Sequence, residues 1–398
     1  MQPPGHHGGY RDAAPPPGMP DPERGRRMVG CGCWTLGMMV GAVLLFLLFV
    51  IFPVASGIGP RMLGAMCVGA GLAFPGAVVY LIVPRLLDRY DPEPWYALVL
   101  ALLWGGVAAC GMSALVNSLV GEVLNQAMGQ GVGNFASLVI SAPIMEEATK
   151  GILVLGYLYF LRREFDGVVD GIIYATFVAI GFAAVENVIY YARAGLEPNA
   201  EESLRAIFFL RGGLTPWAHP LFTSMTGIGV GLARESTKPV VRFISPVLGY
   251  MAAVTLHAIW NGVTTLPSGG IIACLMLPLW MIFVAAFLAI VAVLARRRGS
   301  IIRAHLIDEV ALGHLSQEEL DIVASAFGGI TAYFRKGSAG VEFVRAVARL
   351  ALSKWHSARA MKEVKHTVSM DFIIPLRRKI KELRGQGASP ATGPPPRR

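Results

Sequence analysis

Long apolar runs dominate the hydropathy pattern of this chain, and short segments that carry most of the charge separate them. A helix of about 20 apolar residues crosses the hydrocarbon core of a bilayer. Because a soluble core does not need so many runs of this length, the pattern predicts an all-α, polytopic membrane helical bundle with about eight transmembrane helices. Pro143 should kink or split the fourth helix. The expected spans are 36–54, 62–83, 95–117, 134–160, 168–191, 216–232, 245–265 and 271–294.

Segments outside the spanning core, 28–298, differ from it in composition. Residues 1–27 and 385–398 are rich in Pro and Gly, which predicts disordered tails. Residues 299–384 mix apolar and charged residues at helical spacing, as is typical of a small cytoplasmic helical subdomain. Within it, Ser316-Gln-Glu-Glu319 has the pattern of a capping box that opens a helix.

Charged residues are few and are unevenly distributed along the chain. Only 15% of the residues are charged, although the formal net charge is +9; soluble domains have about 25% charged residues. The basic residues lie mostly beside the apolar runs, so we interpret them as topology signals and expect no nucleic-acid partner. Lys and Arg are concentrated in alternate loops, which predicts an even number of spans and both termini in the cytoplasm.

Several ionisable residues interrupt the apolar runs. A charged side chain at the centre of a bilayer costs about 2.5–3.5 kcal/mol, so such residues face the bundle interior, pair with one another and usually mark a functional site. Glu146 and Lys150 are four residues apart and Glu147 and Lys150 three, so the lysine can neutralise both carboxylates. Paired carboxylates suit general acid–base catalysis. A structural ion pair between helices is the alternative.

Two histidines, His219 and His257, lie in later apolar runs, and Asn261 shares a helical face with His257. If the helices alternate in direction, both histidines and Glu186 fall in the outer half of the bilayer, where they can meet the glutamate pair. Two histidines and a carboxylate form a ligand set for hydrolytic zinc. We therefore expect the two histidines and one buried carboxylate to bind Zn²⁺, although the HExxH signature is absent. In a metal-free alternative, a glutamate activates water while histidine and asparagine stabilise the oxyanion.

Taken together, these motifs resemble those of the PrsW family of intramembrane proteases. Similar short motifs at 91–94 and 166–171 precede the third and fifth helices, and the resemblance covers about residues 60–295. The CAAX prenyl proteases and their bacterial immunity-linked relatives are more distant, because they commonly have histidine where Glu186 stands here. The main motifs are Glu146-Glu147-x-x-Lys150, Phe182-x-x-x-Glu186-Asn187, His219 and His257-x-x-x-Asn261.

The resemblance implies an intramembrane endopeptidase in a bacterial cytoplasmic membrane, which cleaves a membrane protein near the membrane boundary. The best-known substrate of the family is an anti-sigma factor. Expected partners are thus a membrane-protein substrate and the lipid bilayer. The resemblance implies catalytic roles for Glu146, Glu147, His219 and His257, supporting roles for Lys150, Glu186, Asn187 and Asn261, and a metal site of Glu186, His219 and His257.

Two other functions are compatible with the same residues. Buried Glu, Lys and His also form relays in proton- or ion-coupled transporters, although the internal repeat and paired broken helices of a transporter are not evident here. A non-enzymatic membrane scaffold is the other alternative, and it predicts normal function after Glu146→Ala.

Overall fold

The computed structural model describes residues 24–88, 93–162, 164–265, 270–325, 327–362 and 373–386. All regular secondary structure in these ranges is helical, which confirms the all-α prediction. The predicted disordered tails lie largely outside these ranges, although residues 24–27 and 385–386 are helical.

The described residues form two compact units, the bundle unit up to Phe287 and the C-terminal unit from Leu288. The helices of the bundle unit are α1 (Arg24–Phe46), α2 (Phe52–Ala55), α3 (Gly59–Tyr80), α4 (Ile82–Leu87), α5 (Trp95–Leu103), α6 (Cys110–Met128), α7 (Gln130–Ala136), α8 (Ala142–Phe160), α9 (Val168–Ala194), α10 (Ala200–Phe208), α11 (Ala218–Glu235) and α12 (Pro239–Thr265). Its π-helical segments are η2 (Leu47–Ile51), η3 (Trp104–Ala109), η4 (Ser137–Ser141) and η5 (Phe209–Leu214). Helix α13 (Gly270–Ala311) continues into the C-terminal unit, whose other helices are α14 (Gln317–Ala324), α15 (Gly328–Lys362) and α16 (Ile373–Gln386).

Six helical segments among the described residues are long and apolar enough to cross a membrane, so the chain is an integral membrane protein. They are Arg24–Ala55, Gly59–Arg85, Trp95–Met128, Val168–Ala194, Pro239–Thr265 and Pro278–Ala311. The other two predicted spans correspond to α8 and α11, which are helical but less apolar. Helix α8 carries three charged residues, and the 18-residue α11 ends in Arg234-Glu235. These two helices also carry half of the candidate site residues, namely Glu146, Glu147, Lys150 and His219.

The interruption expected at Pro143 is present. Helix α7 passes through the π-helical segment η4 into α8, and Pro143 lies in the first turn of α8. Because proline has no backbone N–H, it removes one hydrogen bond from the helix at this point. Short π-helical segments are frequent at functional sites, and η4 directly precedes the helix that carries Glu146.

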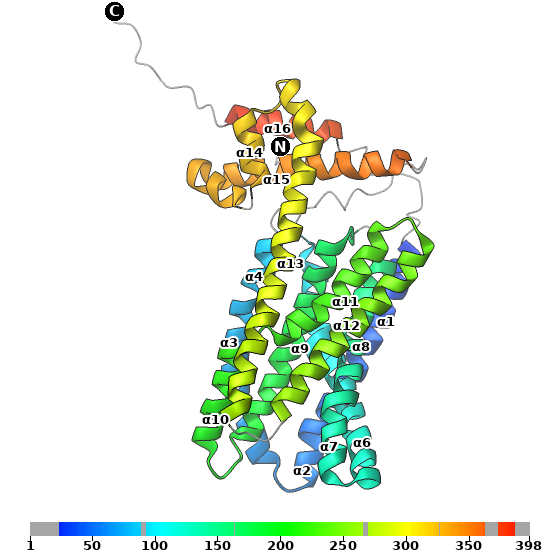
Figure 1. Ribbon diagram of the computed structural model, residues 1–398, viewed down its shortest axis with the longest axis vertical. Coiled ribbons are helices and arrows are strands. Elements are labelled where there is room, and N and C mark those ends of the chain that lie inside the picture. The colour runs from blue at the N-terminus through cyan, green and yellow to red at the C-terminus, as the bar shows by residue number, and fades with distance from the viewer. Residues whose placement is uncertain are drawn as a thin grey trace, which may run out of the picture. The chain divides into compact units, whose positions relative to one another are not determined.

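Helix α9 is the centre of the bundle unit and packs against α3, α5, η3 and α11 (Figure 1). In its most apolar 18-residue window, 89% of the residues are buried, against 6% for α12. Two glycines bring the backbones of α9 and the α5–η3 segment into close approach. A Cβ on Gly181 would lie 1.9 Å from the carbonyl oxygen of Leu102, and one on Gly105 would lie 1.9 Å from that of Val178. Such small residues allow helices in a membrane to pack closely.

We expect Gly181→Ala and Gly105→Ala to lower the free energy of unfolding by about 1–3 kcal/mol each, because the added methyl group overpacks the contact. The measurement is chemical denaturation of the purified chain in detergent. Gly71→Ala in α3 is the matched control, since a Cβ there meets nothing within 4 Å. Equal stability of all three variants would contradict the close-approach interpretation.

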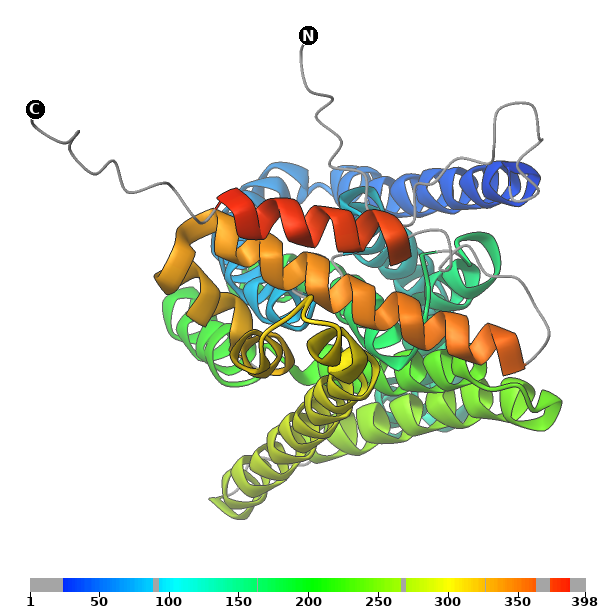
Figure 2. The same cartoon turned by 90° about the horizontal axis from the view of Figure 1, so that it is seen from above.

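The C-terminal unit has a hydrophobic core of its own, built from residues of α13, α14, α15 and α16. Figure 2 shows α16 lying along α15, with which it packs. The predicted capping box is confirmed: the Glu319 backbone N–H donates to Ser316 Oγ at 3.1 Å, and the Ser316 N–H donates to the Glu319 carboxylate at 2.8 Å. Ser316 therefore caps α14 as its sequence pattern predicts.

A buried carboxylate, Glu309, ties three helices of this unit together. Its side chain is inaccessible to solvent and lies 2.6 Å from Arg377 Nη2 in α16, 3.0 Å from Lys354 Nζ in α15 and 2.8 Å from His314 Nδ1. Because removing one partner of a buried ion pair leaves the others uncompensated, the network depends on this one carboxylate.

Glu309→Ala should destabilise the C-terminal unit by about 3 kcal/mol or more. The exposed pair of Glu318 and Arg335 provides the control, because Glu318→Ala should cost at most about 1 kcal/mol. The difference is measured by limited trypsin digestion of the full chain. The rate at which the C-terminal unit is cleaved is recorded for each variant. Equal digestion rates for both variants would show that Glu309 is not a structural centre.

Candidate functional site

Four elements of the bundle unit bring polar and charged side chains to one cavity of about 490 Å³. Helix α8 contributes Glu146, α9 contributes Glu186, and α11 and α12 contribute one histidine each. The site residues from the sequence that line this cavity are Glu146, Glu186, Asn187, His219, His257 and Asn261. Positions more than 100 residues apart along the chain are thus brought together.

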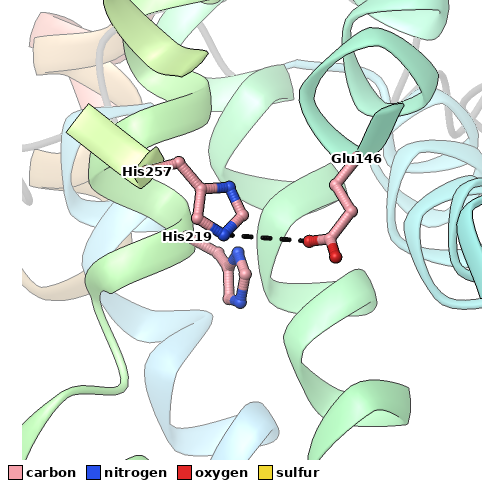
Figure 3. A group of neighbouring side chains, drawn as sticks. All are labelled: Glu146, His219 and His257. Carbon is pink, nitrogen blue, oxygen red and sulfur yellow. Dashed lines mark ion pairs between the residues drawn. The ribbon is translucent and has the colours of Figure 1, made fainter. Parts of the chain in front are cut away.

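Glu146, His219 and His257 form a tight, buried group in which the side chains point toward one another (Figure 3). One potential ligand atom from each lies within 4.8 Å of the others. His257 Nε2 is 3.9 Å from Glu146 Oε2, and the two imidazole rings meet edge to face with their centroids 5.1 Å apart. Among the described residues, this buried Glu146 oxygen has no hydrogen-bond partner.

Each histidine is also held by a second carboxylate. His257 Nδ1 lies 3.1 Å from Glu147 Oε1, and His219 Nε2 lies 2.9 Å from Glu186 Oε2. Because an ionised carboxylate only accepts hydrogen bonds, these two ring nitrogens must carry the hydrogen. His257 Nε2 and His219 Nδ1 then keep their lone pairs. Metal-ligating histidines commonly show this arrangement, with the second ring N–H bound to a carboxylate.

Glu147 is fully buried and already satisfied. Its Oε1 contacts both His257 and Lys150 Nζ, the latter at 2.9 Å, and its Oε2 accepts from Thr223 Oγ1 at 2.8 Å. It is not among the described residues that line the cavity. Glu147 is therefore placed to orient its neighbours, whereas Glu146 faces the cavity.

Lys150 compensates the glutamate pair, which confirms the pairing predicted from their spacing. Its ammonium group is inaccessible to solvent and lies 2.9 Å from Glu147 Oε1 and 3.6 Å from Glu146 Oε2. It also lies 3.1 Å from His219 Nδ1 and 3.9 Å from the centroid of the Phe182 ring. One cation thus contacts two of the three members of the Glu146–His219–His257 group.

Two further residues of the site gave no signal in the sequence. Arg211 in η5 forms an ion pair with Glu186, donates from Nε to Asn187 Oδ1 at 2.7 Å, and lies 4.0 Å from the centroid of the Tyr190 ring. Asn117 in α6 donates from Nδ2 to Glu146 Oε1 at 3.3 Å. In the sequence, Arg211 is one basic residue in a loop, and no short-range pattern connects either residue with its carboxylate.

The remaining motif residues lie outside this contact network. Asn261 Nδ2 donates to the carbonyl oxygen of Leu138 at 2.9 Å, which ties α12 to η4 at the edge of the cavity. Of the motif at 91–94, the first two residues lie outside the described ranges, and Glu93 is buried beside the Tyr174 hydroxyl. Asp170 accepts a hydrogen bond from the backbone of Asp166 at 2.7 Å and so secures the start of α9.

The donor set fits a divalent metal ion. Two imidazole nitrogens and one carboxylate oxygen are a common protein ligand set of catalytic zinc. The unpartnered Glu146 oxygen is the kind of atom that a cation would satisfy. Charge agrees, because the three glutamates of the site exceed its two cations, Lys150 and Arg211, by one. This group differs from the set expected from the sequence, in that Glu146 takes the place given to Glu186, which instead contacts His219 Nε2 and Arg211.

Lys150→Met should lower the free energy of unfolding by about 3–5 kcal/mol, because it leaves Glu147 buried without its cation. Arg205→Met is the matched control: Arg205 forms an exposed i,i+4 pair with Glu201, of a type worth about 0.3–0.5 kcal/mol. Denaturation in detergent compares the two variants. If Lys150→Met lowers the free energy of unfolding no more than the control does, the buried ion pair contributes little to stability.

Comparison with known proteins places the chain in a family. A family model described as PrsW family intramembrane metalloprotease matches residues 93–293, just over half of the chain, and this stretch contains the whole glutamate–histidine group. The chain belongs to the PrsW family. Membership confirms the family resemblance and makes the chain an intramembrane peptidase, so the transporter alternative is not favoured.

Individual PrsW proteins are similar over parts of the chain. Protease PrsW of Geobacillus kaustophilus is 29% identical over 171 residues, which cover 43% of this chain and 68% of that protein. The Bacillus subtilis protein of the same name is 28% identical over 199 residues, or 50% of this chain and 82% of its own length. Protease PrsW of Clostridioides difficile is 33% identical over 106 residues, 27% of this chain and 43% of that protein. The more distant relation to the CAAX prenyl proteases is not confirmed, and no solved structure matches.

Proposed function

We propose that this PrsW-family member hydrolyses peptide bonds of a membrane-protein substrate at the bundle cavity, and that Glu146, His219 and His257 hold a zinc ion there. The observation that carries the proposal is that each histidine makes separate contacts through its two ring nitrogens. One ring nitrogen of each is bound to its own carboxylate, while the other lies within the Glu146 group, where His219 Nδ1 also contacts Lys150 Nζ at 3.1 Å, a contact that a bound ion would replace. A structural ion pair alone would not need two histidines oriented in this way.

The carboxylates have separate roles in this proposal. Glu147 fixes the ring and tautomer of His257, and Glu186 does the same for His219, as the second carboxylates of metal-bound histidines do. Lys150 neutralises the α8 pair, and Thr223 holds the remaining oxygen of Glu147. Glu147 is thus a positioning residue, because no oxygen of its carboxylate is left for a substrate.

A zinc ion, when bound, supplies a Lewis acid that lowers the pKa of water to about 7. The chain must then accept the proton of the attacking water. Besides Glu146, the glutamate that lines the cavity is Glu186. Its Oε2 contacts His219 and Arg211, which leaves Oε1 to take the proton. Arg211, which also lines the cavity, carries the positive charge that would stabilise an oxyanion on the substrate.

The finer setting is part of the same proposal: a bacterial plasma membrane, with both termini in the cytoplasm. The relatives described above are bacterial proteins. The concentration of Lys and Arg in alternate loops supports the orientation. Water and a peptide must both reach the glutamate–histidine group, and the cavity provides room for them.

The test combines metal analysis of the purified full chain with a cleavage assay in membranes that contain a mixed pool of single-span membrane proteins. The wild type should hold about one zinc ion per chain and generate new protein termini. His219→Ala, His257→Ala and Glu146→Gln should lose both properties, since each removes a ligand. Glu147→Gln should weaken zinc binding by about 10–100-fold, because it only orients His257.

Glu186→Gln separates chemistry from metal binding. It should weaken zinc binding no more than Glu147→Gln does, but reduce cleavage at saturating zinc by about 10²–10⁴-fold, the usual effect of removing a general base. Glu201→Gln on the exposed surface of α10 should change neither property. Cleavage by a metal-free wild type would overturn the zinc assignment, and cleavage that survives Glu146→Gln would overturn the proposed site itself.

A further inference from the structure

Part of the cavity lining comes from residues that the family model does not match. Six of its lining residues come from the first two spans and the turn between them, before residue 93, where the match begins. None of the six has a polar side chain, whereas the rest of the lining includes Glu146, Glu186 and both histidines. We call them the N-terminal lining residues, and they are Leu48, Phe49, Phe52, Pro53, Ile58 and Met62.

These residues present accessible apolar surface at the cavity. Phe52 is 68% exposed and Ile58 is 44% exposed, and Phe49 and Met62 are partly buried. They lie on the π-helical segment η2, on α2, and at the start of α3. An apolar group that entered the cavity would therefore pack against these side chains, which is favourable through dispersion contacts.

The polar part of the cavity favours a peptide over a lipid acyl chain as the occupant. Asn117 lines the cavity and uses its Nδ2 to contact Glu146 Oε1, while its buried Oδ1 has no partner among the described residues. An unpartnered buried acceptor is unfavourable, and an acyl chain has no donor to offer. A peptide offers a backbone N–H to this oxygen and an apolar side chain to the N-terminal lining residues.

We propose that the N-terminal lining residues determine substrate specificity, by receiving a large apolar side chain next to the scissile bond while Asn117 Oδ1 accepts a backbone N–H of the same peptide. The substrate class is thus a peptide segment with Leu, Met or Phe beside the cleaved bond. This inference rests on the proposed peptidase function. It assigns specificity to the first two spans, separately from the catalytic group on α8, α9, α11 and α12.

The test compares cleavage by the full chain in membranes that contain a mixed pool of single-span membrane proteins, and reads the residues that flank each new terminus. The wild type should cleave beside large apolar residues. Phe49→Ala with Phe52→Ala enlarges the cavity and should lower kcat/KM at Leu-flanked sites by about tenfold or more, chiefly through KM. Met62→Trp narrows the cavity and should shift the preference toward smaller residues such as Ala.

Phe46→Ala is the matched control, because Phe46 lies in α1, is 54% exposed and does not line the cavity. It should leave both the rate and the flanking residues unchanged. Since Phe49 also packs against the core, unfolding in detergent is measured for each variant, and the single change Phe52→Ala tests the proposal without that contact.

The outcomes separate this inference from the function on which it rests. If the wild type generates no termini beyond those seen with Glu146→Gln, the proposed function fails. If the wild type cleaves, but Phe52→Ala and Met62→Trp cleave beside the same residues at the same rates, the specificity proposal is wrong and the proposed function stands. Opposite shifts of preference in the enlarged and narrowed cavities would support the specificity proposal.

Discussion

The buried contact between one lysine and two glutamates is the constraint on which the rest of the bundle depends. A charge in an apolar interior is strongly unfavourable unless an opposite charge lies beside it. Lys150 meets this condition for both Glu146 and Glu147 within a single turn of α8. The negative charge that Lys150 does not compensate lies beside the two histidines. Glu186, the third glutamate, is paired with Arg211 and His219. The helices that carry the site, α8, α9, α11 and α12, therefore present charged or polar groups to one another, whereas η2, α2 and α3 face the cavity with apolar side chains.

The same constraint is reflected in the composition of α8 and α11, which carry half of the candidate site residues. Helices α8 and α11 fall short of the length or hydropathy expected of a membrane span, and many of their residues are buried by neighbours. The strongly apolar α9 lies between them and the other helices, and its glycines allow the close packing that brings Glu186 to His219. The apolar helices around them thus allow α8 and α11, which carry charged residues, to lie within the membrane.

Much of this arrangement follows from local pattern in the sequence. The length of the apolar runs indicates the spanning helices. The spacing of Glu146, Glu147 and Lys150 predicts their ion pairs, and Pro143 predicts the irregular helical segment before α8. Which carboxylate joins both histidines depends on the rotation of four helices about their axes, which no local pattern encodes. Arg211 and Asn117 were missed for the same reason, since each contacts a carboxylate at least 25 residues away.

The position of Lys150 also bears on how such a centre is assembled. In small zinc domains the binding free energy of the ion is needed for folding, and the ion also neutralises its anionic ligands. Here an ammonium group from the same helix already contacts Glu146 and His219, and so performs that neutralising role with a covalently attached charge. The helices can therefore associate in the bilayer before any ion is supplied. An ion bound as proposed would then enter a bundle that has already formed.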